Sequence, residues 1–314
     1  MKTKILALCG GIGGAKLAFG LSKILSTEKL ILLINTGDDF IHHNLKICPD
    51  MDTVMYTLAE INDKVKGWGI QNETWNTLKS LKKLGADSWF QLGDKDLATH
   101  LRRTSLLNEG KKLSYITQYL SNLLGVNHNI FPMSETPVST MLITDVGRLS
   151  FQEYFVKLRY KPKVKSLEYV GREEAKVPKS LDKMILENLF SGIIICPSNP
   201  YLSIDPILSI NKIKKYLKET TSPVLVVSPI INNKSVKGPT SKIMKELGKD
   251  PSVQTIADHY QEISDVLMID NKDSKNISKI NSMSIETDSI YMGDNIKKIA
   301  LAKRCLEILE GMSV

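Results

Sequence analysis

The chain has few of the features that mark disulfide-rich, metal-ribbon or membrane proteins. Its 314 residues include only four cysteines, and no two of these form a CxxC pair. Scattered cysteines exclude a zinc ribbon and argue against a disulfide framework, which suits a reducing compartment. No apolar run approaches the ~18 residues that a membrane-spanning helix requires. We therefore expect a cytoplasmic protein that has no membrane partner.

The common nucleotide-binding fingerprints are also missing. Residues 10–14 are rich in glycine and follow the first apolar run, but their spacing is not that of a dinucleotide-binding loop. They do not form a Walker loop either, because Lys16 is not followed by Ser or Thr. These absences disfavour a nicotinamide-dependent oxidoreductase.

The glycine-rich segment nevertheless favours phosphate binding. Glycines allow the backbone to approach a phosphate closely, and the start of the following helix attracts negative charge. A tight turn would use the same residues, so this alternative stays open. The residues that we predict to bind nucleotide phosphates here are Gly10, Gly11, Gly13, Gly14 and Lys16.

A net charge of +8 raises the question of nucleic-acid binding. The richest basic stretch, residues 157–183, is interrupted by acidic residues such as Glu168 and Asp182. No nucleic-acid-binding motif accompanies it, so a solvated face is the simpler interpretation. We expect no nucleic-acid partner.

Short apolar runs recur along the chain, and each ends in small or polar residues. They cover residues 5–8, 30–34, 193–196, 224–227, 266–269 and 290–292. Such runs are typical of strands buried on both faces of a parallel sheet, and helical patterns lie between several of them. The pattern predicts an α/β fold with a Rossmann-like, doubly wound, mostly parallel sheet. Ligands bind beyond the carboxyl ends of strands in such a sheet.

Residues 51–183 do not follow this rhythm, and we predict them to be an inserted cap that binds the acceptor substrate. The core would then consist of residues 1–50 and 184–314. Within the cap, helical patterns are followed by patterns typical of strands. The predicted helices cover residues 51–60, 75–84, 96–108 and 113–124, and the predicted strands cover residues 138–144, 151–159 and 165–170.

Four aspartates lie close together after the second apolar run. Asp38 and Asp39 follow that run after three residues, and Asp50 and Asp52 stand at the start of the next helical pattern. Clustered carboxylates can hold Mg²⁺ or orient a hydroxyl nucleophile, although a plain turn favours the same residues. We predict that Asp38, Asp39 and Asp50 are metal ligands and catalytic residues, without choosing the general base. Asp52 is interpreted as a helix N-cap.

Two later strand ends carry further candidates for nucleotide binding. One follows the run at residues 193–196, and the other follows the run at residues 224–227 and continues into a basic loop. The residues concerned are Ser198, Asn199, Ser228, Pro229, Lys237 and Gly238.

Taken in order, these motifs resemble the 2-phospho-L-lactate transferase family, which builds the deazaflavin coenzyme F-420. The matching words are GGIGGAKLA, NTGDD, ICPDMDTVMYTLA, GWGIQNETW, WFQLGDKDLATHL, MSETPVSTM, PSNPYLSIDPIL and SPIINNKSVKGPT. They extend from residue 10 to about residue 243. The resemblance implies a Rossmann-like core, bound Mg²⁺ and a homodimer.

The resemblance also implies a reaction. A phospholactyl or phosphoenolpyruvyl group would pass from a guanosine diphosphate adduct to the ribityl hydroxyl of the deazaflavin Fo, releasing GMP. The family's acceptor-binding aspartate falls on Asp50, and its partner cation falls on Lys95, where the family usually has Arg. The alternative is a nucleotide-sugar-binding regulator of the gluconeogenesis-factor type, without catalysis.

Overall fold

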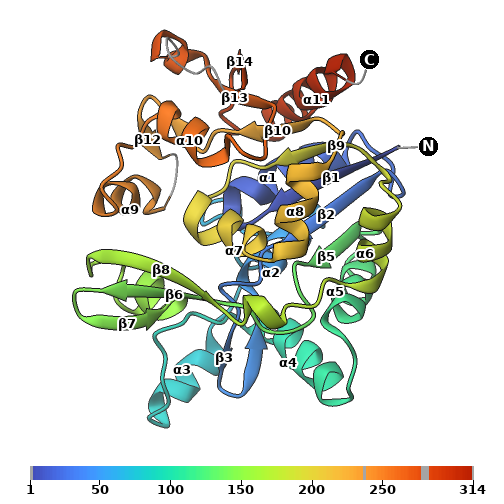
Figure 1. Ribbon diagram of the computed structural model, residues 1–314. Helices are drawn as coiled ribbons and strands as arrows, with labels where there is room; N and C mark the ends of the chain where they lie inside the picture. Colours follow the sequence, from blue (N-terminus) through green and yellow to red (C-terminus); the bar gives the residue numbers. More distant parts are fainter. Residues whose placement is uncertain (1–2, 236–237, 277–282, 313–314) are drawn as a thin grey trace.

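The computed structural model describes residues 3–235, 238–276 and 283–312, and a sheet of seven parallel strands forms the centre of this part (Figure 1). The strand order is β14-β13-β10-β9-β1-β2-β5. The bounds are β1 Lys4–Cys9, β2 Leu30–Ile34, β5 Asn129–Pro132, β9 Phe190–Ile195, β10 Val224–Val227, β13 Val266–Asp270 and β14 Ser284–Asp288. The predicted α/β fold with a Rossmann-like parallel sheet is confirmed.

Helices cover both faces of the sheet because alternate side chains of each strand enter different cores. Ala7 of β1 packs in one core, and Leu8 packs in the other. The first core contains side chains from α1 Gly11–Ser22, α2 Pro49–Leu58, α5 Leu113–Leu123 and α11 Asn295–Met312. The second contains side chains from α6 Lys179–Leu186, α7 Asp205–Leu208, α8 Asn211–Glu219, α9 Thr240–Glu246 and α10 Val253–Tyr260. None of the described helices is both long and apolar enough to cross a membrane.

The strand order reverses between β1 and β9. The chain runs from β1 outward through β2 to β5, and the later strands run from β9 outward in the opposite direction. Loops that follow two such neighbouring strands diverge and leave a crevice between them, which is the usual ligand site of open α/β sheets. The loops in question begin at Gly10 and Cys196.

The segment predicted as a cap contributes to the core as well. It supplies β5, which is the edge strand beside β2, and α5, which packs on the sheet. Several of its other parts lie on the opposite side of the molecule from β14 and α11 (Figure 1). These parts include α3 Asn76–Lys83, α4 Asp94–Asn108 and the sheet of β6 Ser139–Thr144, β7 Gly147–Ser150 and β8 Val164–Val170. The division into core and cap domains itself stays a prediction.

Two predicted strands are wrong. Residues 151–159 are mostly helical and include the π-helix η1 Glu153–Lys157. Phe151 and Phe155 stand four residues apart and stack on each other with ring centroids 5.3 Å apart, which is helical spacing. Residues 290–292 form no strand, and the preceding residues form β14 instead. Between β9 and β10 the chain forms two helices, α7 and α8, rather than one.

The remaining short elements connect these layers. The antiparallel hairpin of β3 Phe40–His42 and β4 Leu45–Ile47 joins β2 to α2. The others are η2 Arg172–Glu174, η3 Pro200–Ile204, β11 Ile230–Ile231, β12 Lys234–Ser235 and η4 Asn271–Asn276.

Candidate active site

A cavity of about 660 Å³ opens at the carboxyl ends of the central strands. Loops after β1, β2, β9 and β10 form its floor, and residues of the cap form its walls. The cavity therefore lies where the reversal of strand order predicts it. Many of the predicted site residues line it, namely Gly10, Gly11, Gly13, Lys16, Asp38, Asp50, Ser198, Asn199, Ser228, Pro229 and Gly238.

The glycine-rich turn brings the start of α1 to the cavity. Gly11 has a φ of 60°, a conformation that costs other residues steric strain. Its N–H donates a 2.7 Å hydrogen bond to Oδ1 of Asp50. A Cβ on Gly13 would overlap the carbonyl oxygen of Pro197, and a Cβ on Gly14 would press on Ser198 and Cys9. The glycines thus permit the loops after β1 and β9 to pack against each other beside the cavity.

We expect that Gly13→Ala destabilises the protein by about 3 kcal/mol, because the backbone carbonyl of Pro197 cannot move aside as a side chain would. Gly311→Ala is the matched control, since a Cβ there meets nothing within 4 Å and alanine favours a helix. Urea denaturation of both variants measures the difference. Equal stability of the two would show that the loops do not need this close packing.

The loop after β9 is held to the glycine turn by reciprocal hydrogen bonds. Ser198 Oγ donates to the carbonyl of Gly10 at 2.7 Å and accepts from its N–H at 3.3 Å. Oδ1 of Asn199 accepts from the N–H groups of Tyr201 and Leu202 and so caps the π-helix η3. This orients the Asn199 amide, whose Nδ2 is buried and has no hydrogen-bond partner among the described residues. A ligand oxygen could accept from it.

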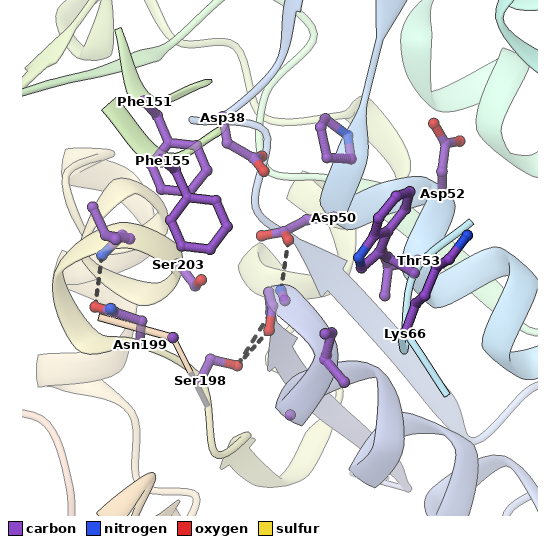
Figure 2. A pocket seen from close by; sticks show the side chains of 18 of the residues that line it. Asp38, Asp50, Asp52, Thr53, Lys66, Phe151, Phe155, Ser198, Asn199 and Ser203 are labelled. Atoms are coloured by element: carbon purple, nitrogen blue, oxygen red, sulfur yellow. Dashed lines mark hydrogen bonds between the residues drawn. The ribbon is translucent and has the colours of Figure 1, made fainter. Parts of the chain in front are cut away.

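Asp38 and Asp50 form an acidic centre on the cavity floor, and Figure 2 shows both side chains close together above the glycine turn. Asn35 donates from Nδ2 to Asp50 Oδ2 at 2.9 Å and, more weakly, to Asp38 Oδ1 at 3.5 Å. Burial raises the pKa of Asp50 to about 6, despite the hydrogen bonds from Asn35 and Gly11. Burial, together with the charges of Asp50 and Asp39, holds the pKa of Asp38 well above its ordinary value.

Asp39 is separated from this pair. It does not line the cavity, and its Oδ2 lies 3.1 Å from Lys46 Nζ and 3.0 Å from Cys48 Sγ. Asp38 lies in a turn closed by a 3.2 Å hydrogen bond from the Asp39 N–H to the Thr36 carbonyl, and Asp39 leads out of that turn into the hairpin, so the two side chains reach different surroundings. The predicted catalytic and metal-binding role of Asp39 stays a prediction, whereas Asp38 and Asp50 are placed together.

Three other predicted residues also lie away from the cavity or outside the described part. Gly14 packs beneath the turn, as described above. Lys95 Nζ donates to the carbonyl groups of Gln71 and Asn72 and does not line the cavity. Lys237 lies outside the described residues. The acceptor-binding role of Lys95 stays a prediction.

The interpretation of Asp52 as an N-cap is wrong. The N-cap position of α2 is Cys48, and Asp52 lies within the helix, where it pairs with the fully buried Arg103 of α4. Tyr56, Asp96 and His100 adjoin this pair and, with Asp52, line the cavity. None of these partners was predicted. Asp52 and Tyr56 are four residues apart on α2, and Asp96, His100 and Arg103 are four and three residues apart on α4. This spacing places the side chains on one face of each helix, so it could have identified both polar faces.

Aromatic residues of the cap form the wall opposite α2. In Figure 2, Phe151 and Phe155 lie on one side of Asp50, and Lys66 lies on the other. Gln152 between the two phenylalanines donates from Nε2 to the backbone carbonyl of Asp38 at 3.2 Å, which ties this wall to the acidic centre. Trp68, Trp89 and Phe90 also line the cavity. These rings give the cavity a partly apolar lining.

The fold and the cavity define a Rossmann-like α/β protein with an acidic site at the switch point of its parallel sheet. The chain belongs to the family described as 2-phospho-L-lactate transferase CofD, whose profile matches residues 5–306. It is a family of transferases, so the predicted resemblance is confirmed.

Relatives from archaea and bacteria match most of the chain. A 2-phospho-L-lactate transferase of Methanosarcina mazei is 38% identical over 86% of this chain and 88% of its own length. That of Methanocaldococcus jannaschii is 37% identical over 96% and 97%. A phosphoenolpyruvate transferase of Streptomyces griseus is 33% identical over 98% of both chains. A UPF0052 family protein of Bacillus halodurans shares the fold, with a TM-score of 0.68 and 14% identity over 98% and 99% of the chains.

Proposed function

We propose that this protein transfers a phospholactyl or phosphoenolpyruvyl group from a guanosine diphosphate adduct to the ribityl hydroxyl of the deazaflavin Fo, in coenzyme F-420 biosynthesis. The observation that carries the proposal is the Asp38–Asp50 pair, which faces the start of α1 in a cavity with an aromatic wall. The names of the relatives agree with this chemistry. They do not decide which acid the donor carries, because both 2-phospho-L-lactate and phosphoenolpyruvate transferases are among them.

The donor would lie along the floor of the cavity. The first turn of α1 and the Nδ2 group of Asn199 supply donors for the diphosphate oxygens. Ser228, Pro229 and Gly238 line the same floor and would contact the nucleoside. The planar ring of the acceptor would rest on the aromatic wall, with its hydroxyl at Asp50.

The acidic centre suits a divalent cation. Asp38 and Asp50 accept hydrogen bonds from neutral groups, and neither forms an ion pair within the described part of the chain. Two buried carboxylates without a cation between them repel each other, and Mg²⁺ prefers such oxygen ligands. Asp38 and Asp50 would hold Mg²⁺, which would neutralise charge on the diphosphate when bound.

The proposed reaction is a nucleophilic displacement at a phosphorus atom of the donor. The hydroxyl oxygen of the acceptor forms a bond to the phosphorus that carries the acid, while the bond from that phosphorus to the bridging oxygen of GMP breaks. The bridging oxygen leaves with the bond's electron pair as part of GMP. The hydroxyl proton passes to a carboxylate, and Asp50, with a pKa of about 6, can accept it near neutral pH.

The test is turnover with Fo, the guanylyl donor and Mg²⁺, followed by GMP release. We expect activity to vanish with EDTA and return with Mg²⁺, and apparent Mg²⁺ affinity to rise as pH increases through about 6, since the carboxylates must lose their protons to bind metal. Full turnover in chelator would contradict the metal role. If the protein binds a nucleotide sugar and transfers no group, the alternative of a non-catalytic regulator of the gluconeogenesis-factor type would be supported instead.

Asp38→Asn tests the metal site without relying on activity. The raised folded-state pKa of Asp38 means that the metal-free fold loses stability as pH rises from the unfolded-state value towards the folded one. In EDTA at pH 8 the variant should therefore be more stable than the wild type, because it carries no buried charge at this position. Mg²⁺ should stabilise the wild type and leave the variant unchanged in thermal denaturation. Equal stabilisation of both proteins would exclude Asp38 as a ligand.

A further inference from the structure

Helix α2 presents one polar face to the cavity below the acidic centre. Asp50, Asp52, Thr53 and Tyr56 all line the cavity and are buried. Because an α-helix rises 1.5 Å per residue, Tyr56 lies about 9 Å along the helix from Asp50. A chain of several carbon atoms whose end reaches Asp50 would therefore run along this face.

Helix α4 completes this face with a second set of buried polar groups. Arg103 forms a two-point ion pair with Asp52, in which Nη1 lies 3.1 Å from Oδ2. The Tyr56 hydroxyl donates to Asp96 Oδ1 at 2.7 Å. Burying so many polar groups at a cavity wall costs free energy that apolar packing would avoid, which points to a role in binding. We call Asp52, Tyr56, Asp96 and His100 the polar wall.

His100 is held in one orientation by Arg103. The ring is 1% exposed, and its Nδ1 lies 3.1 Å from Arg103 Nη1. A guanidinium can only donate, so Nδ1 accepts and the ring proton of neutral His100 lies on Nε2. Nε2 lies 3.2 Å from Asp96 Oδ1, but it has no aligned hydrogen-bond partner among the described residues. The ring thus keeps an unused donor on the edge that faces away from Arg103.

A metal ion does not fit the polar wall, although the ligand atoms of Asp52, Asp96 and His100 lie within 4.8 Å of one another. The guanidinium of Arg103 already binds both oxygens of Asp52. Its positive charge would repel a cation placed between the three side chains. The wall instead offers carboxylate acceptors beside a histidine donor.

We propose that the polar wall binds the polyhydroxylated chain of the acceptor, with Asp96 and Asp52 accepting from its secondary hydroxyl groups and His100 Nε2 donating to one of them. Each hydroxyl group both donates and accepts, which matches alternating acceptors and donors along the wall. The inference rests on the proposed function, because that function places the terminal hydroxyl at Asp50. It assigns recognition of the acceptor chain to residues that take no part in the displacement.

The experiment compares Fo with a deazaflavin whose ribityl chain is replaced by 5-hydroxypentyl. This analogue keeps the ring and the terminal hydroxyl and lacks the secondary ones. Binding of both compounds is followed by deazaflavin fluorescence for the wild type, Asp96→Asn, His100→Leu and His100→Gln. His259→Leu is the matched control, since that histidine pairs with Asp205 and does not line the cavity. Thermal denaturation confirms that each variant is folded.

We expect the wild type and His259→Leu to prefer Fo at least tenfold in Kd. His100→Leu and Asp96→Asn should bind Fo less tightly and the analogue unchanged, so that the preference falls below threefold, while His100→Gln should restore part of it. Equal affinity of the wild type for both compounds would overturn the inference and leave the proposed function standing. So would equal weakening of both compounds by His100→Leu, since that is a structural effect. A wild type that binds neither compound would overturn the proposed function itself.

Discussion

Asp50→Asn is expected to reduce the transfer rate at least about a thousandfold, because in the proposed reaction the variant would lack both a negative charge for Mg²⁺ and the group that would accept the hydroxyl proton. The affinity for GDP should stay within about threefold, a difference of ~0.7 kcal/mol. Asparagine is preferable to alanine here, because its oxygen can still accept from the N–H of Gly11 and preserve the glycine turn. Rapid-quench measurement of GMP release and GDP titration test the two expectations.

Asp258→Asn is the matched control, since that aspartate lies exposed on α10 and accepts only from Gln254 among the described residues. It should leave both transfer and GDP binding unchanged. Undiminished transfer by Asp50→Asn would exclude Asp50 from the chemistry. A loss of GDP affinity with full Fo affinity would show that the donor and acceptor sites are reversed.

Arg103→Met should destabilise the protein by about 3–5 kcal/mol, because it leaves the buried carboxylate of Asp52 without its counter-charge. Adding Asp52→Leu should recover most of that loss, since the double variant has no unpaired buried charge. Arg148→Met is the control. Arg148 pairs with Glu168 at 3.1 Å, but both side chains are about half exposed, and such pairs contribute less than about 1 kcal/mol. Urea denaturation at pH 7 measures all three effects.

The destabilisation by Arg103→Met should also depend on pH. Burial raises the pKa of Asp52, and Arg103 opposes that rise in the wild type. Without Arg103 the folded-state pKa lies further above the unfolded-state value, so the loss of stability is small at acidic pH and grows as pH rises towards the folded-state pKa. A loss that stays constant between pH 4 and pH 8 would show that packing of the arginine, rather than its charge, is what the protein needs.

The sequence alone determined the class of fold and the place of the site. Apolar runs such as residues 30–34 are buried on both faces, and that burial requires a parallel sheet with helices on each side. Because parallel strands all end at the same edge, Gly10, Asp38, Ser198 and Ser228 were expected to meet there, and they line one cavity. The order of the motifs also predicted the family, since so many matching segments do not occur in one order by chance.

The tertiary structure decided which of the candidate side chains share the cavity. Asp38 faces it and Asp39 turns to Lys46, a difference set by the hairpin of β3 and β4 rather than by any local preference. The sequence alone suggested that Asp52 is a helix N-cap. In the structure it pairs with Arg103 of α4, which lies fifty-one residues later in the chain. Contacts at such separation depend on how helices pack, and side-chain periodicity within one helix says nothing about which helix will lie against it.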